Sequence, residues 1–255
     1  MSRDEIIEKL RDDANYYGAF GKQFMSTSDI KVLVDTPDLY GQVRGDDSNL
    51  LKGSYFHKRI LEPESLEGAF TIINASTRTT KEYKNAVADA SLDGVNNPYF
   101  LLQKEVDEME ILASKLESND EFVDALQYQK QPFEVEEPSV GGILGITFKG
   151  KADRINRRRG FIADLKTSRS LESFRFNFKS YGYHAQAYVY SKLFGLPVRF
   201  YVIGKEDGRM GVYDVSDETL NLGERYVEWG IERYHLYYGE NPLSEITQYY
   251  EQDTI

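Results

Sequence analysis

Apolar side chains recur at helical spacing through the first half of the chain. Ile6, Ile7, Leu10 and Ala14 form one stripe within residues 3–16, which predicts an amphipathic helix there. Four further helices are predicted: Ser26 or Ser28 to Val34, 50–62, Pro98 onward with apolar steps to Leu116, and Asp120 to about Gln129. The first two of these should end before Pro37 and Pro63, because helical backbone is disfavoured at the residue that precedes a proline.

The apolar period changes near residue 132, where short alternating runs replace the helical stripes. Six strands are predicted: 133–137, 144–149, 151–156, 161–166, 198–204 and 210–215. Helical patterning returns from Ser170 to Phe194 with a bend near Tyr181–Gly182, and again over 217–238, before a loose tail from Asn241. We expect a mixed α/β fold in one domain, with a mostly helical part (1–131), a sheet core (132–215) and a C-terminal helix and tail (216–255).

Composition excludes several classes of protein. None of the 255 residues is cysteine, so disulfides, thiolate zinc sites and cysteine nucleophiles are absent. No apolar run approaches the roughly 18 residues of a membrane helix. The charged N-terminus predicts that there is no signal peptide, and we therefore expect a cytoplasmic protein without a membrane partner.

Charge is distributed unevenly along the chain. The formal net charge is −11, yet residues 149–179 hold ten Lys and Arg against three Asp and Glu. Such asymmetry is typical of a basic surface that faces a polyanion such as DNA. A solvated charged stretch is the ordinary alternative.

Two aspartates should face each other within this basic stretch. If the strands around Asp153 and Asp164 join through a turn at Arg157–Gly160, both residues are equidistant from the turn centre. Directly opposite residues of a hairpin lie about 5 Å apart, where like charges are unfavourable. A cation should therefore lie between them. Lys166 could supply it in a plain salt-bridged pair, or a divalent metal could bind two carboxylates and a backbone carbonyl.

Asp, a spacer and Asp-x-Lys form the signature of the PD-(D/E)XK nucleases, which this stretch resembles. The following helix, Gly182-Tyr-His-Ala-Gln186-Ala-Tyr-Val-Tyr190, is similar to the Gln-xxx-Tyr helix of RecB-type members. Upstream, Gly53-xxx-His57 and Leu61-Glu62-Pro63 look like a segment of the RecE-like phage exonucleases, and Ser26-Thr-Ser28 resembles their N-terminal helix start. Ala152 replaces the proline of the family signature, and residues 66–131 match no segment that we can name.

The resemblance implies a restriction-endonuclease-like core, with a central mixed sheet flanked by helices and an N-terminal helical region. It further implies an Mg²⁺-dependent DNA exonuclease that cleaves phosphodiester bonds with two metal ions, Mn²⁺ being a substitute. The metal ligands would be His57, Asp153, Asp164 and the Leu165 carbonyl. Lys166, Gln186 and Tyr190 would complete the catalytic set. The residues assigned to DNA binding are Arg154, Arg157, Arg158, Arg159, Thr167, Arg169 and Tyr183.

The resemblance also suggests a role in phage recombination or DNA degradation, a homo-oligomeric ring and a single-strand annealing partner. A RecB-like endonuclease or repair nuclease is an alternative, as is a non-catalytic DNA-binding protein with the same fold. His57, Gln186 and Tyr190 could also be ordinary packing residues. Some members have an extra upstream acid, and the sequence leaves open whether Glu134, Glu136 or Glu137 supplies it.

Overall fold

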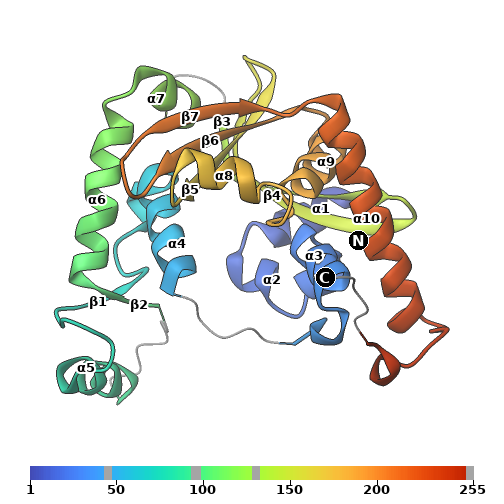
Figure 1. Ribbon diagram of the computed structural model, residues 1–255, viewed down its shortest axis with the longest axis horizontal. Coiled ribbons are helices and arrows are strands. Elements are labelled where there is room, and N and C mark those ends of the chain that lie inside the picture. The colour runs from blue at the N-terminus through green and yellow to red at the C-terminus, as the bar shows by residue number, and fades with distance from the viewer. Residues whose placement is uncertain (43–47, 93–98, 128–132, 251–255) are drawn as a thin grey trace.

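A five-stranded mixed sheet forms the centre of the molecule (Figure 1). The computed structural model describes residues 1–42, 48–92, 99–127 and 133–250. The strands, in their order across the sheet, are β3 (Phe133–Ile143), β4 (Ile146–Asn156), β5 (Phe161–Ser168), β6 (Val198–Gly204) and β7 (Met210–Asp214). β5 and β6 run parallel, whereas the other neighbours are antiparallel. The predicted mixed sheet is confirmed.

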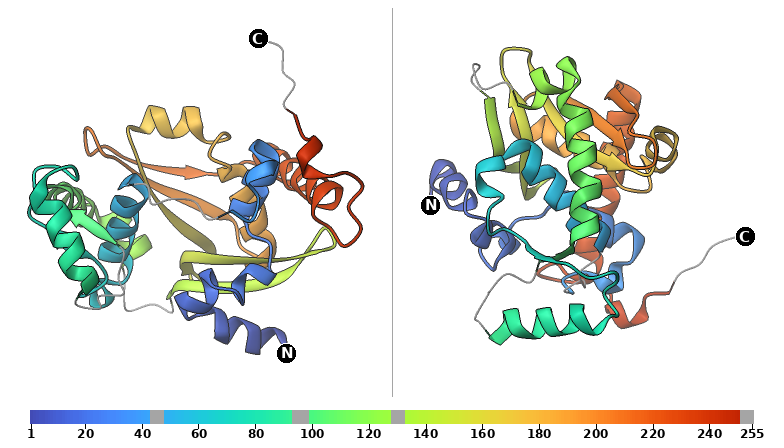
Figure 2. Two further views of the ribbon diagram at one scale, coloured as in Figure 1. Left: turned by 90° about the horizontal axis from the view of Figure 1, so that it is seen from below. Right: turned by 90° about the vertical axis from the view of Figure 1, so that its left-hand side faces the viewer.

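Helices cover both faces of this sheet (Figures 1 and 2). The α-helices are α1 (Arg3–Leu10), α2 (Asp13–Tyr17), α3 (Thr27–Asp35), α4 (Ser48–Leu61), α5 (Lys81–Leu92), α6 (Gln103–Glu117), α7 (Asp120–Leu126), α8 (Leu171–Asn177), α9 (Tyr183–Phe194) and α10 (Asp217–Tyr237). A small parallel pair, β1 (Thr71–Ile73) and β2 (Phe100–Leu102), lies beside α6. Among the described helices, none combines the length and the apolar content needed to cross a membrane.

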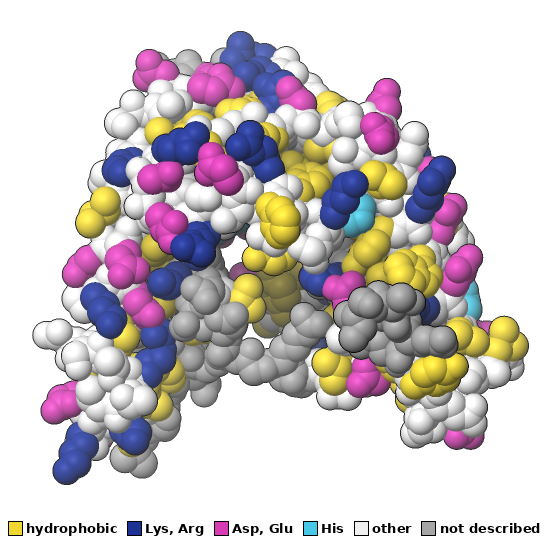
Figure 3. Space-filling model, in the orientation of Figure 1, with side chains coloured by type: hydrophobic (Ala, Val, Ile, Leu, Met, Phe, Trp, Pro, Cys, Tyr) yellow, Lys and Arg dark blue, Asp and Glu magenta, His cyan; other side chains and the backbone are white. Residues whose placement is uncertain are grey.

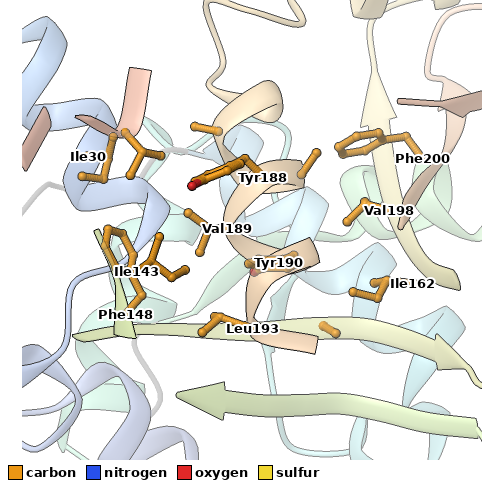
Figure 4. Packing of buried hydrophobic residues seen from close by; sticks show 14 of the residues in the cluster. Ile30, Ile143, Phe148, Ile162, Tyr188, Val189, Tyr190, Leu193, Val198 and Phe200 are labelled. Carbon is orange, nitrogen blue, oxygen red and sulfur yellow. The ribbon is translucent and has the colours of Figure 1, made fainter. Parts of the chain in front are cut away.

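Two large apolar clusters, and a smaller third one that joins α1 and α2 to β3, hold helices against the sheet. The first joins the sheet to α3, α8, α9 and α10, and Figure 4 shows Ile30, Tyr188 and Phe200 within it. The second joins the opposite face to α4, α6 and α7 and includes Leu165. Successive side chains of a strand point to opposite faces, so β5 sends Ile162 into the first cluster and Leu165 into the second. Asp164 therefore projects toward the α9 side.

The β3–β4 hairpin differs from the predicted set of short strands. Each strand runs unbroken for 11 residues. The turn between them is Leu144-Gly145, with φ of 50° and 82°. Two consecutive positive φ values give the tight turn whose twist matches that of a hairpin, so Leu144 belongs to the turn and not to a strand.

Three helix boundaries also differ from the predictions. Residues 3–16 form two helices, because the Asp12 side chain accepts the Ala14 N–H at 2.8 Å and begins α2. The helix expected from Pro98, a residue outside the described ranges, begins only at Gln103, since Leu102 ends β2. The helix from Asp120 ends at Leu126, and Gln129 is likewise outside the described residues.

The C-terminal tail is not loose as far as the structure describes it. Ile246–Gln248 form a turn of 3₁₀ helix, and the Tyr237 and Tyr249 rings lie 6.2 Å apart. Tyr249 therefore has a partner on α10, which the sequence pattern does not reveal.

Candidate active site

Asp153 on β4 and Asp164 on β5 come together where the two strands separate. The last paired residues are Arg154 and Ala163, and one further step of this register places the aspartates opposite each other. Asp153 Oδ2 instead accepts the N–H of Leu165 at 2.7 Å. Asp164 is fully buried and Asp153 is 8% exposed. The two carboxylates thus share a site from which water is largely excluded.

A third carboxylate, Glu136, flanks Asp153 on its other side. β3 and β4 pair Val135 with Arg154 and Glu137 with Ala152, so Glu136 falls opposite Asp153. Its φ of 46° is in the left-handed region, which costs a residue with a side chain on the order of 1–3 kcal/mol and is concentrated at functional sites. The sequence offered Glu134, Glu136 and Glu137, and only Glu136 joins the aspartates.

His57 from α4 completes a set of possible metal ligands. One ligand atom each from His57, Glu136 and Asp153 lies within 4.8 Å of the others. Two bonds of about 2.0–2.4 Å to a common ion span this distance. The donor set of one imidazole and two carboxylates suits a divalent cation such as Mg²⁺ or Mn²⁺. These residues therefore fit the divalent metal that the family resemblance implies.

The surroundings of His57 keep its imidazole neutral. Burial lowers its pKa to about 4, and the nearby Lys166 ammonium adds to this effect. Its Nδ1 lies 3.5 Å from Asp153 Oδ2, and the imidazole also hydrogen-bonds to the Leu165 backbone. A metal ligand must be the neutral imidazole, so His57 is in the required state at neutral pH.

Lys166 and Gln186 both contact Asp164. The Lys166 ammonium forms an ion pair with Oδ2, while Gln186 Nε2 donates to Oδ1 at 2.6 Å. Burial raises the pKa of Asp164 to about 6, although Lys166 opposes the rise. Burial alone would lower the pKa of Lys166, but the carboxylates of Asp164 and Asp153 outweigh it and hold this pKa above its ordinary value. The lysine therefore remains charged.

The predicted tyrosines of α9 pack beside this group. α9 begins after Gly182, whose φ is 75°. The Tyr183 ring lies 5.3 Å from Lys166 Nζ and 5.5 Å from the ring of Phe174. Tyr190 is buried, and a Cβ at Gly150 would come within 2.9 Å of its ring. Tyr183 thus borders the carboxylates, whereas Tyr190 packs between α9 and β4.

Three of the arginines assigned to DNA binding, Arg157, Arg158 and Arg159, lie at the other end of the β4–β5 hairpin. Arg157 forms two hydrogen bonds with Glu134, of 2.6 and 2.8 Å. Arg159 contacts Glu121 and Asp124 of α7, at 2.9 and 3.0 Å. Arg158 lies 3.8 Å from Asp124, and Arg154 is buried. Arg169 pairs with Glu206 at 2.7 Å. Thr167 lies beside α4, where its Oγ1 would be 4.0 Å from a Cβ added to Gly53. The structure does not bring the turn arginines to the carboxylates.

These shifted pKa values predict how the stability of the metal-free protein depends on pH. Burial, followed by Asp153, raises the pKa of Glu136 to about 8. An acid with a raised pKa in the folded state loses its stabilising contribution as the pH rises through that value. Asp164 acts in this sense between about pH 4 and 6, but His57, with a lowered pKa, acts in the opposite sense there. Asp153, whose pKa burial also raises, acts in the same sense as Asp164. We therefore expect stability to fall from about pH 4.5 to 8, and above about pH 6.5 His57 no longer opposes the fall. Thermal unfolding in chelator would show it, and a steady rise over this window would contradict the assignment.

The role of Glu136 can be separated from that of its neighbour. In Glu136→Gln, a charge that repels Asp153 is lost, so the metal-free protein should melt a few °C higher at pH 8, since about 1 kcal/mol corresponds to roughly 2–4 °C at this chain length. The rise in melting temperature caused by Mn²⁺ should become smaller. Glu137→Gln is the matched control, because Glu137 pairs with Arg11 and should not alter the effect of the metal. Equal effects of the two substitutions on metal stabilisation would rule out the special role of Glu136.

Comparisons with known proteins identify the family and the fold of this chain. Residues 27–236 match the model of a family described as PDDEXK-like domain of unknown function (DUF3799). A solved structure of a putative exonuclease from Eubacterium rectale is similar, with a TM-score of 0.61 and 19% identity over 88% of this chain and 85% of that one. At this identity the likeness shows a common fold.

Two other solved structures are more distant. The protein SSO0001 has a TM-score of 0.33 and 18% identity, over 80% of this chain and 83% of that one. A phage-related exonuclease from Haemophilus somnus has a TM-score of 0.32 and 16% identity, over 73% of this chain and 96% of that one. No curated protein matches the sequence.

Proposed function

This chain belongs to the family of PDDEXK-like domains, and from that membership we propose that it is a divalent-metal-dependent DNA exonuclease with little sequence preference. The observation that carries the proposal is the convergence of five side chains from four elements, α4, β3, β4 and β5, on one largely buried site. These side chains are His57, Glu136, Asp153, Asp164 and Lys166. A purely structural salt bridge needs neither the neutral imidazole nor the third carboxylate.

The chain's residues would divide the work of hydrolysis between metal binding and charge stabilisation. A divalent metal bound here supplies a more acidic water and neutralises charge that builds on phosphate. His57, Glu136 and Asp153 would hold one ion, and Asp164 with the Leu165 carbonyl would hold a second beside Asp153. Mg²⁺ is the proposed ion, and Mn²⁺ its substitute.

Lys166 would act on the phosphate and the attacking water. Its ammonium remains charged and lies against Asp164, so it can stabilise negative charge in the transition state. Gln186 would orient Asp164, since its amide occupies Oδ1 and leaves Oδ2 toward Lys166. Both residues thus act through charge and orientation at the buried carboxylate.

A cavity with several cationic lining residues supports binding of a nucleic-acid backbone. The cavity of about 510 Å³ lies between α6 and the segments that follow β5 and β6. Its cationic lining residues are Lys52, Lys115, Arg169 and Lys205. Two acids line it as well: Glu108, which pairs with Lys52, and Glu206, which pairs with Arg169. Figure 3 shows the adjoining face hollowed at its centre, with Lys and Arg among the side chains over α4 and α6. Contacts to backbone phosphates carry no sequence information, which is why we propose little sequence preference. The ring assembly, annealing partner and recombination role are further parts of the proposal.

The decisive experiment is digestion of end-labelled linear duplex in Mg²⁺, beside a covalently closed circle of the same sequence. An exonuclease should shorten the linear DNA progressively, leave the circle intact, and lose activity in chelator. Because phosphate contacts dominate binding, the apparent affinity should fall steeply with salt. Cleavage of the circle would identify an endonuclease, and intact DNA under all conditions would leave only the non-catalytic alternative.

A further inference from the structure

Two tyrosines of α2 lie beside two buried lysines of β4, next to the carboxylates. The Tyr16 ring packs against both ammonium groups, with Lys149 Nζ at 4.3 Å and Lys151 Nζ at 4.6 Å from its centroid. Lys149 also donates to the Tyr16 carbonyl at 2.5 Å, and Lys151 forms an ion pair with Asp13. These contacts fix α2 on β4 at a point two residues before Asp153.

Tyr17, the next residue, presents an exposed ring from this fixed position. Its side chain is 65% exposed, although its ring meets Tyr16 edge-on at 5.0 Å and Lys151 Nζ at 5.4 Å. Surrounding protein atoms raise the pKa of its hydroxyl, and the carboxylates of Glu136, Asp13 and Asp153 add to the rise. The exposed ring therefore lies against Lys151, which is two residues before the candidate metal ligand Asp153 on β4.

We propose that Tyr17 stacks on an unpaired base of the DNA strand next to the scissile phosphate. This inference rests on the proposed nuclease function and specifies which form of DNA the site prefers. Every base has a face that an aromatic ring can cover, so stacking tolerates any sequence. Inside a duplex both faces of a base are already covered by its neighbours. The site should therefore favour a strand whose end is unpaired.

Rigid placement is what distinguishes Tyr17 from an ordinary surface aromatic. Single exposed apolar side chains are common and need no explanation. Trp229 on α10 is such a residue: it is 46% exposed and has a cation, Arg233, at 4.8 Å, but it lies outside the set of carboxylates. Trp229→Ala is therefore a matched control, in which an exposed aromatic beside a cation is removed elsewhere.

The test measures binding without cleavage. The probe is a duplex with a short overhang ending in 2-aminopurine, whose fluorescence falls when it stacks, in Ca²⁺ under conditions that yield no product. Wild type should quench the fluorescence and prefer this probe to the blunt duplex. Tyr17→Ala should bind the overhang roughly five- to a hundredfold more weakly and lose the quenching. Tyr17→Phe and Trp229→Ala should behave like wild type.

Several results would overturn the stacking role. They include wild-type quenching in Tyr17→Ala, equal losses in Tyr17→Phe and Tyr17→Ala, and no quenching by a wild-type protein that still cleaves DNA. The last result leaves the nuclease proposal intact, whereas a protein that neither binds nor cleaves DNA refutes both. If Tyr17→Ala unfolds, Tyr17→Leu replaces it, since leucine keeps the bulk without an aromatic face.

Discussion

Asp153→Asn should abolish both metal stabilisation and DNA cleavage while leaving the fold intact. The asparagine keeps the size of the side chain and an oxygen that can accept the Leu165 N–H, now accepted at 2.7 Å. It removes the charge that lies between Glu136, Asp164 and His57. A ligand at a hundredfold excess over its dissociation constant stabilises the folded state by about 2.7 kcal/mol. This gain should disappear, and cleavage should fall by at least about a hundredfold.

Differential scanning calorimetry with and without Mn²⁺ tests the binding, and digestion of labelled duplex tests the activity. Asp124→Asn is the control: Asp124 pairs with Arg159 at 3.0 Å on the turn of the same hairpin, so its loss should leave the Mn²⁺ effect unchanged. The metal-free Asp153→Asn protein should be at least as stable as wild type, because repulsion is relieved. An undiminished Mn²⁺ shift in Asp153→Asn would refute the metal site.

The sequence predicts the β4–β5 hairpin because its turn is polar and short. Arg157–Gly160 separates two apolar runs, and Gly160 has a φ of 74°, a conformation that favours glycine. The same reasoning would have paired Glu136 with Asp153 around the turn at Leu144-Gly145. That turn is hidden, since Leu144 continues an apolar run and a leucine with positive φ is unusual. The choice among three glutamates therefore required the structure.

Contacts between distant elements explain what else the sequence could not provide. His57 reaches Asp153 because Phe56 and Ile60 of α4 pack in one cluster with Leu165, and spacing along the chain does not encode this docking. The arginines after Asn156 illustrate the reverse case. Their charge suggested a DNA contact, but the acids that bind them come from β3 and α7. Local charge thus cannot show whether its counterions are already present in the protein.

Lys166→Ala should separate chemistry from metal binding. Lysine carries no electron pair for a metal while charged, and its ammonium here is held in the charged state by Asp164 and Asp153. Its removal should leave the Mn²⁺-induced stabilisation near that of wild type, since the carboxylates and His57 remain. Cleavage should nevertheless fall by at least about a hundredfold, the scale of one strong electrostatic group aimed at the transition state.

Single-turnover cleavage at saturating Mn²⁺ measures this loss without interference from product release. Lys192→Ala is the matched control, because Lys192 also lies over an aromatic ring, that of Tyr188 at 5.3 Å, but does not contact the carboxylates. Lys166→Arg keeps the positive charge on a larger, planar group, so it should bind metal normally and restore little activity. Cleavage by Lys166→Ala at a rate close to that of wild type would mean that the lysine only neutralises Asp164, and that stabilisation of the transition-state charge would come from the bound metal alone.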